Sequence, residues 1–124
     1  MSKFVRVKTE LRDPALIKRA LDDLRIRYKE NERYTHRWSG YSGTVPFLVE
    51  LNRVTFALRP TAEENFEVIG DDMQMRAIRA AMAQVEQRYA YHSVLTETAK
   101  AGFELVDESV GRDNVIRLTV RRWS

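Results

Sequence analysis

A long amphipathic pattern between residues 73 and 101 constrains the fold of this chain more than any other feature. Its apolar side chains recur at spacings of four, three, four and three residues, as they do along one side of an α-helix. That side consists of Ile78, Met82, Val85, Tyr89 and His92, and it is extended by Leu95 and Ala99. Asp71 or Asp72 can cap the start, and Gly102 suits the left-handed position just after the end. A helix of this length needs a broad apolar surface to pack against.

Alternating patterns on both sides of this helix predict strands that supply such a surface. Strands are predicted over residues 4–11, 45–51, 53–59, 66–69, 103–106 and 115–123, with 25–39 as an exposed strand or a long, broken hairpin. Asp13 and Pro14 predict the start of a short helix over residues 14–24. The connections are too short for parallel crossovers. We therefore expect an α+β fold, a mostly antiparallel sheet of about five to seven strands with two helices packed on one face.

The middle of the chain carries two further signals about this sheet. Val45, Phe47 and Val49 alternate with other residues, so we expect them to share one face. Pro46 cannot donate a ladder hydrogen bond, and it therefore indicates that residues 45–51 form an edge strand.

The composition limits the class of protein. The 124 residues fit one domain, residues 1–124, and the absence of cysteine excludes disulfide scaffolds, cysteine nucleophiles and thiolate metal sites. There is no apolar run long enough for a signal sequence or a membrane span, so we expect a cytoplasmic protein without a membrane partner. The net charge of +3 is too small to indicate nucleic-acid binding by itself.

Residues 87–93, QRYAYHS, form the densest polar and aromatic run. A functional interpretation makes His92 a general base or ligand in a pocket with Tyr89 and Tyr91. A structural interpretation makes Tyr89 a core ring with its hydroxyl at the rim, and His92 a hydrogen-bonded boundary residue. We favour the structural interpretation, because no carboxylate or second histidine lies at a supporting helical spacing.

Motifs for catalysis, cofactors and metals are not found. His36 and His92 are the only two histidines and lie in different predicted elements. The acidic pairs Glu63-Glu64 and Asp71-Asp72 could hold a hard cation, but paired acids next to a helix start are more commonly caps. Residues 40–43, GYSG, are too short and isolated for a phosphate loop. We therefore expect no enzymatic activity, no cofactor and no metal.

Cationic side chains alternate with apolar ones on three of the predicted strands. They are Arg6 and Lys8, Arg33 and Arg37, and Arg117 and Arg121. If those strands are neighbours, one face of the sheet carries a basic patch for nucleic acid or an acidic partner. We favour a solvated outer face, because few aromatic residues lie between the cations and glutamates dilute the patch.

The side of the sheet away from the helices could also bind a protein. It offers a flat face, with Pro46 at a possible edge and Trp123 at the chain end. Our first hypothesis is therefore a non-catalytic accessory or adaptor domain that binds a protein or a second copy of itself. The alternatives are a nucleic-acid-binding module that uses the basic face, and a small-molecule binder with a pocket near Tyr89, Tyr91 and His92.

Several short motifs point to one family. They are Gln87-Arg88-Tyr89-Ala90-Tyr91, Gly102-Phe103 and Arg121-Arg122-Trp123, with Arg12-Asp13, Ala20-Leu21-Asp22-Asp23-Leu24 and Gly40-Tyr41-Ser42-Gly43. On these residues the chain resembles the chloroplast open reading frame thirty-five family, conserved hypothetical proteins of plastids, cyanobacteria and other bacteria. The similarity is firmest over residues 4–24 and 85–123, and residues 44–70 depart from it. The resemblance implies a compact, soluble, intracellular domain and no assigned activity.

Overall fold

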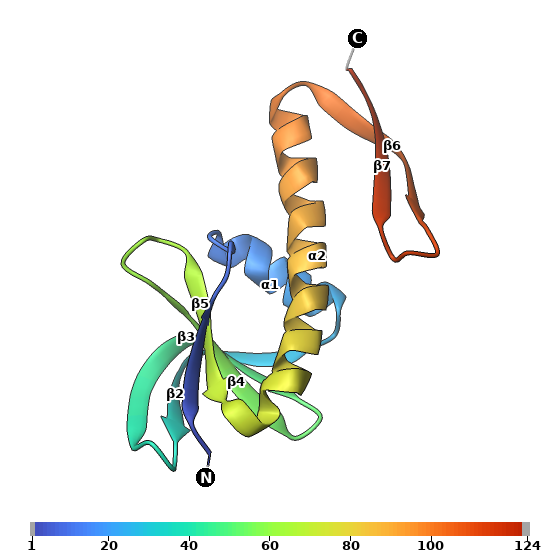
Figure 1. Cartoon of the computed structure of the whole chain (residues 1–124). Coiled ribbons are helices and arrows are strands. Elements are labelled where there is room, and N and C mark those ends of the chain that lie inside the picture. The colour runs from blue at the N-terminus through green and yellow to red at the C-terminus, as the bar shows by residue number, and fades with distance from the viewer. Residues whose placement is uncertain (1, 123–124) are drawn as a thin grey trace.

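The computed structural model describes residues 2–122 and arranges them around one long helix (Figure 1). The chain begins with β1 (Phe4–Lys8), α1 (Pro14–Asp23), β2 (Arg27–His36) and β3 (Tyr41–Leu51). It continues with β4 (Val54–Pro60), β5 (Phe66–Asp71), a 3₁₀ turn (Asp72–Gln74), α2 (Met75–Lys100), β6 (Phe103–Val110) and β7 (Ile116–Arg122). All strand pairs are antiparallel, so the predicted α+β class is confirmed.

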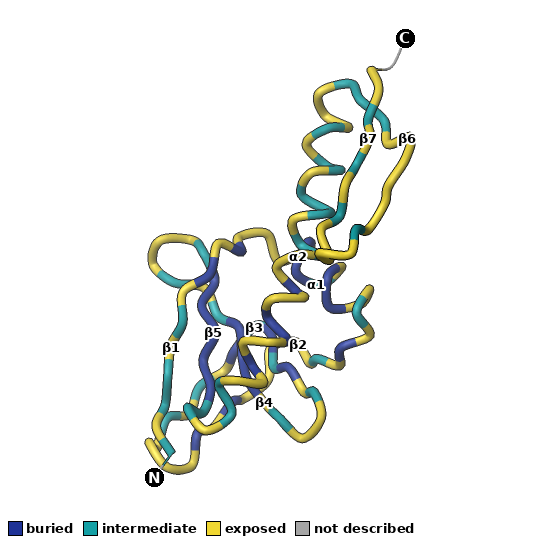
Figure 2. The backbone as a smooth tube through the Cα atoms, turned by 45° about the vertical axis from the view of Figure 1, so that its right-hand side comes forward, coloured by how far each residue is buried: buried dark blue, intermediate teal, exposed yellow. Residues whose placement is uncertain are grey.

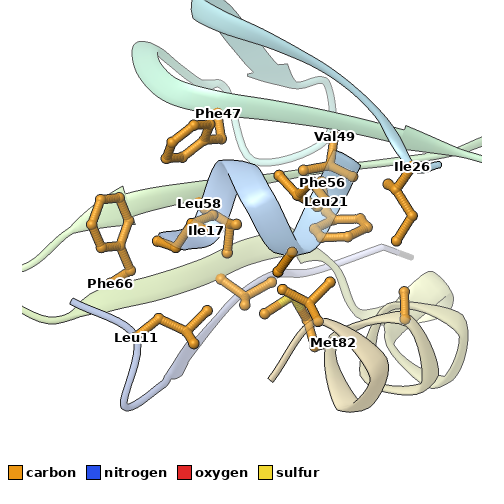
Figure 3. Close-up of a cluster of buried hydrophobic side chains, with 14 of the residues drawn as sticks. Leu11, Ile17, Leu21, Ile26, Phe47, Val49, Phe56, Leu58, Phe66 and Met82 are labelled. Atoms are coloured by element: carbon orange, nitrogen blue, oxygen red, sulfur yellow. The ribbon is translucent and has the colours of Figure 1, made fainter. Parts of the chain in front are cut away.

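Five strands form one sheet in the order β1-β5-β4-β3-β2, with β1 and β2 at its edges. Both helices pack on the same face, as predicted, and close the main core against the strands (Figure 3). The core includes Ile17 and Leu21 of α1, Phe47, Phe56, Leu58 and Val68 of the sheet, and Ile78, Met82 and Val85 of α2. The sheet thus supplies the broad apolar surface that the long helix requires.

Local sequence signals set the ends of several elements. The Asp13 side chain accepts a hydrogen bond from the Ala15 N–H at 2.9 Å, and Pro14 occupies the first turn of α1. Asn52 and Arg53 have φ values of 47° and 67°, the twist that a two-residue turn between β3 and β4 requires.

The sheet face away from the helices is partly covered rather than open. A second buried cluster of Tyr34, Val45, Ala57 and Ile69 lies there, with Phe4, Tyr41 and Leu48 packed against it. The prediction that Val45 shares a face with Phe47 and Val49 is wrong. The change of side coincides with Pro46, which lacks an N–H, and with Asn31 opposite it, whose φ is 55°. β3 is an interior strand, so Pro46 marks an irregularity in the ladder and not an edge.

The helix α2 has 26 residues and is therefore about 39 Å long. The Asp71 side chain accepts a hydrogen bond from the Met73 N–H at 2.8 Å before the helix starts, and Gly102 follows its end with a φ of 87°. Only the first half of α2 has buried residues, the last of them Val85. Within residues 2–122, no helix is long and apolar enough to cross a membrane.

The strands β6 and β7 form a hairpin that does not join the main sheet, so that sheet has five strands and not seven. The length of α2 carries the hairpin past the sheet to the far end of the helix (Figure 1). In the described part of the chain, every buried residue lies at or before Val85 (Figure 2). We refer to residues 2–85 as the body and to residues 86–122 as the arm. Trp123 lies outside the described residues.

Candidate functional site

Tyr89 fastens the start of α1 to α2. Its ring is half-buried and packs against the main core. Its hydroxyl accepts hydrogen bonds from the backbone N–H groups of Arg12, at 3.1 Å, and Asp13, at 3.0 Å. Because both amides precede the first turn of α1, this contact matches the structural interpretation of a core ring with its hydroxyl at the rim.

His92 has a carboxylate partner that its own helix could not reveal. Its Nε2 lies 2.6 Å from Oδ2 of Asp23, the last residue of α1, and Arg88 Nε donates to the same oxygen at 3.0 Å. Burial acts to raise the pKa of Asp23, but the hydrogen bonds from His92 and Arg88 bring it below its ordinary value of 3.8. Asp23 is therefore ionised near neutral pH and holds the end of α1 against α2.

Tyr91 and Gln87 fasten the hairpin to α2. A hydrogen bond to Glu108 of β6 raises the pKa of Tyr91, and the Arg88 guanidinium carbon lies 4.0 Å from the centre of its ring. The Gln87 side-chain amide donates to the carbonyl oxygen of Asn114 in the turn between β6 and β7. These contacts are polar, and they hold the hairpin without burying any residue.

The three residues of the predicted pocket do not share a cavity. Tyr89 lines a groove of about 530 Å³ between α2 and the end of β1, whereas Tyr91 lines a separate cavity of about 260 Å³ between α2 and β7. His92 lines neither of them, and its side chain is 15% exposed. A general base needs space for a substrate beside its ring. The geometry therefore gives the Asp23–His92 pair a positioning role between the helices.

The six cationic residues of the predicted basic face are not brought together. β1 and β2 are opposite edges of one sheet, and β7 belongs to the other. Four of the six contact other side chains of the protein. They are Lys8 with Glu63 at 3.5 Å, Arg33 with Ser42 Oγ at 2.9 Å, Arg117 with Asp113 at 3.2 Å, and Arg121 with Glu104 at 2.5 Å. Arg6 lies on the edge strand β1, and Arg37 lies just after β2. The strands are not neighbours, so the six do not form one sheet face.

A second polar group, which the sequence did not reveal, joins the β2–β3 turn to the start of α2. His36 is buried, with Nδ1 2.7 Å from Ser39 Oγ and Nε2 3.0 Å from Asp71 Oδ2. The Ser39 N–H donates to Nδ1 at 3.2 Å, so the ring hydrogen lies on Nε2 and points at Asp71. Burial acts to raise the pKa of Asp71, but hydrogen bonds from the Met73 N–H and His36 bring it below 3.8.

The order of Ser39, His36 and Asp71 is that of a nucleophile, its base and a carboxylate, but their surroundings are those of a turn. Ser39 Oγ also accepts from the Tyr41 N–H at 3.1 Å, which closes the turn. Ser39 does not line the cavity of about 380 Å³ beside His36 and Asp71. Asp71 acts as a helix cap, one of its two predicted roles, and the group as a whole ties the hairpin to that cap.

A groove runs along the body between β1 and α2. One part has a volume of about 170 Å³ and is lined by residues that include Val7, Thr9, Met75, Met82, Ala83 and Glu86. Thr9 and Glu86 also line the part that contains Tyr89, so the two parts are continuous. We refer to both parts together as the β1–α2 groove.

The groove lies beside a free edge of the sheet, because β1 pairs only with β5 among the described strands. The Thr9 N–H donates to the Phe66 carbonyl at 3.1 Å, and the Asp72 N–H donates to the Lys3 carbonyl at 2.9 Å. Odd-numbered residues of β1 therefore bond to β5, and backbone groups of Arg6 and Lys8 point away from the sheet. A further strand could pair with these groups.

Comparison with known proteins identifies relatives over almost the whole chain. The family described as "Protein of unknown function (DUF1257)" matches residues 20–119. The "Uncharacterized protein ycf35" of Cyanophora paradoxa is 30% identical over 127 residues, covering 99% of this chain and 98% of the relative. The proteins of the same description from Pyropia yezoensis and Guillardia theta are 26% and 28% identical, covering 100% and 99% of this chain and 99% and 98% of theirs. No solved structure matches the chain.

Proposed function

Because the chain belongs to the DUF1257 family of unknown function, as its motifs predicted, and its relatives are described only as uncharacterized, we propose its function from geometry. We propose a non-catalytic accessory domain, acting in the cytoplasm, that binds an extended segment of a protein. The observation that supports this proposal is the free edge of β1 beside the β1–α2 groove.

The proposed mode of binding is strand addition. An incoming segment would pair with the outward N–H and C=O groups of β1 and gain affinity from main-chain hydrogen bonds. Its alternate side chains would enter the groove and contact Val7, Met75 and Met82. The side of α2 that lines the groove carries the small residues Ala83, Ala90 and Ser93, which leave space for those side chains.

The two alternative functions draw less support from the geometry. Nucleic-acid binding needs cations and stacking aromatic rings on one surface, but the six predicted cations are spread over two sheets. Small-molecule binding near Tyr89, Tyr91 and His92 needs a common cavity, and these residues do not line one.

A groove-filling substitution tests the proposal. Ala83 is exposed and lines the groove, so Ala83→Trp fills it without entering the core. Ala80 is exposed on the same helix and does not line the groove, which makes Ala80→Trp the matched control. The probe is a displayed library of unstructured peptides of about twelve residues, selected on the immobilised protein, with Kd then measured by fluorescence anisotropy.

We expect selected peptides to bind Ala83→Trp at least about tenfold more weakly than wild type, and Ala80→Trp equally well, because only the first substitution occupies the space of the bound side chains. The proposal fails if no peptide is enriched above background, or if the selected peptides bind Ala83→Trp as tightly as the unsubstituted protein.

A further inference from the structure

The strand β6 is an exposed edge of the same kind as β1. Among the strands of residues 2–122 it pairs only with β7; it has no buried residue, and its last six residues are all exposed. Three apolar side chains on it are accessible: Leu105 is 37% exposed, Val106 46% and Val110 65%. An exposed strand edge with apolar side chains is a template for pairing with another chain.

The two faces of β6 differ in character. Ile116 and Leu118 of β7 line the cavity against α2, and Val110 is paired with Ile116, so it shares their face. Leu105 is paired with Val120, which alternates with Leu118 on the same side. Glu104 and Asp107 are paired with Arg121 and Thr119 and lie on the other face. On its helix side β6 therefore carries Leu105 and Val110 together with Glu108, which is paired with Leu118 and bonded to Tyr91 of α2. On the opposite side it carries Glu104 and Asp107.

The strand β1 has the same arrangement with the opposite charge. Val7 lines the groove on the helix side, and Val5 shares its face by alternation. Arg6 and Lys8 are exposed on the other side. Placed beside β1 in parallel orientation, β6 would align Leu105 and Val110 with the valines on the helix side and place Asp107 next to the cations, which favours the pairing.

We infer that the segment which enters the β1–α2 groove is β6 of a second copy of this chain. This inference rests on the proposed function of β1 as a strand acceptor, and it names the partner. The contact would extend the five-stranded sheet by the β6–β7 hairpin of the other copy. Within one chain, β6 and β1 lie far apart on either side of α2, so the pairing is between copies (Figures 1 and 2).

Charge selects this pairing over the other pairings of two copies. Two β1 strands side by side would oppose the cations Arg6 and Lys8, and two β6 strands would oppose the carboxylates Glu104 and Asp107. Like charges in opposed positions destabilise a strand pair. The contact is between unlike surfaces, so it closes as a dimer where each copy gives its β6 to the other, and otherwise continues as a chain of copies.

The arm also lacks buried apolar contacts, which docking on β1 of a second copy would supply. Residues 86–122 contain apolar side chains but none that is buried. A two-stranded hairpin on its own is only marginally stable in water and needs further strands or packing. Docking on the β1 edge would give β6 a second hydrogen-bonded neighbour and cover Leu105 and Val110.

Charge reversal at one position on each strand tests the inference. Arg6 and Asp107 are suitable because neither forms an ion pair within the part of the chain described, so reversing them breaks no internal contact. The variants are Arg6→Glu and Asp107→Arg, and Arg37→Glu is the control because Arg37 is also an exposed cation but lies just after β2. Sedimentation equilibrium measures the association of each protein alone and of an equimolar mixture of the first two.

We expect the wild-type chain to associate to at least twice its 14.5 kDa mass, and Arg37→Glu to behave likewise. Arg6→Glu and Asp107→Arg alone should each associate about tenfold more weakly, since every contact then opposes like charges. The mixture should recover wild-type association, because each contact between the two variants again pairs opposite charges. A purely structural effect of either substitution would not be reversed by mixing.

Two results overturn the inference: a chain that stays monomeric up to about 1 mM, or an association that neither reversal weakens and mixing does not alter. They are distinguishable from failure of the proposed function. If the chain is monomeric but the selected peptides bind Ala83→Trp more weakly than wild type, the proposed function stands and only the identity of the partner is wrong. If the chain associates as expected but no peptide is enriched, the β6 contact stands and the proposed binding of other proteins is wrong.

Discussion

The body and the arm are held together in different ways. The body encloses two buried clusters on the two faces of its sheet, whereas none of the described residues of the arm is buried. Within the arm, the β6–β7 hairpin is held to α2 by polar contacts from Gln87 and Tyr91 and by half-buried apolar residues of β7 (Figure 2). The difference indicates that the buried clusters of the body supply most of the stability of the fold, and that the β6–β7 hairpin gains order from what it contacts.

Equivalent truncations in the two regions should give the largest contrast. Phe56 is buried in the main core, while Phe103 of the arm is half-buried. We expect Phe56→Ala to lower the free energy of unfolding by about 3–5 kcal/mol, because it removes apolar contacts and leaves a cavity. Phe103→Ala should lower it by roughly 1 kcal/mol. Urea denaturation measures both, and equal losses would remove the distinction between the regions.

The next largest loss of unfolding free energy should come from the contacts of Asp71 inside the body. Asp71→Ala removes the acceptor for the Met73 N–H and the partner of buried His36. We expect a loss of about 2–3 kcal/mol, since both a cap and a buried hydrogen bond disappear. Asp72→Ala removes only an acceptor for the Lys3 N–H and should lower the free energy of unfolding by about 0.5–1 kcal/mol. Thermal unfolding of the pair checks this order, which a larger effect at Asp72 would contradict.

The periodic features of the fold could be predicted from the sequence, and the long-range ones could not. The stripe of α2, the Asp13 cap and the hairpin around Asn52 depend on residues close together in the chain, and the structure has them. Alternation assigns a strand to a face but does not name its neighbour, so the positions of β1 at an edge and of β7 in a second sheet were not predictable.

The candidate site divides in the same way. The helical spacing placed Tyr89 and His92 toward the body, but Asp23 is 69 residues from His92 and His36 is 35 residues from Asp71. Such pairs depend on how the elements pack, which no local pattern encodes. The change of side at Val45 was missed for a related reason, because a regular alternation continues through Pro46 in the sequence but not in the ladder.

The junction between body and arm should show a smaller and pH-dependent effect. Asp23→Asn removes the charge that Arg88 and His92 share, and we expect a loss of about 1 kcal/mol at pH 7, since water screens a side chain that is 35% exposed. The pKa of Asp23 is lowered in the folded state, so its contribution is complete above 3.8 and is lost as the pH falls through the folded value. Urea denaturation at pH 7 and near pH 2.5 tests this, and a difference from wild type that persists undiminished at the lower pH contradicts it.

The smallest effect should come from the surface of the arm. Arg117 and Asp113 are paired at 3.2 Å, but their side chains are 59% and 54% exposed. Arg117→Ala should change the free energy of unfolding by less than about 0.5 kcal/mol.

Because Arg117 lies on a different sheet from Arg6, Arg117→Glu should also leave the retention of the protein on an RNA oligomer at low salt unchanged. A clear loss of retention would instead favour the nucleic-acid alternative.

Hydrogen exchange of the intact chain at about 1 µM tests the central contrast most directly, because dilution keeps the arm free of a second copy. We predict that the amides of β6 and β7 exchange at least about 100-fold faster than those of β3, β4 and β5, since the hairpin can open while the body stays folded. Equal protection of the two sheets, with the arm exchanging only when the whole chain unfolds, would contradict the account.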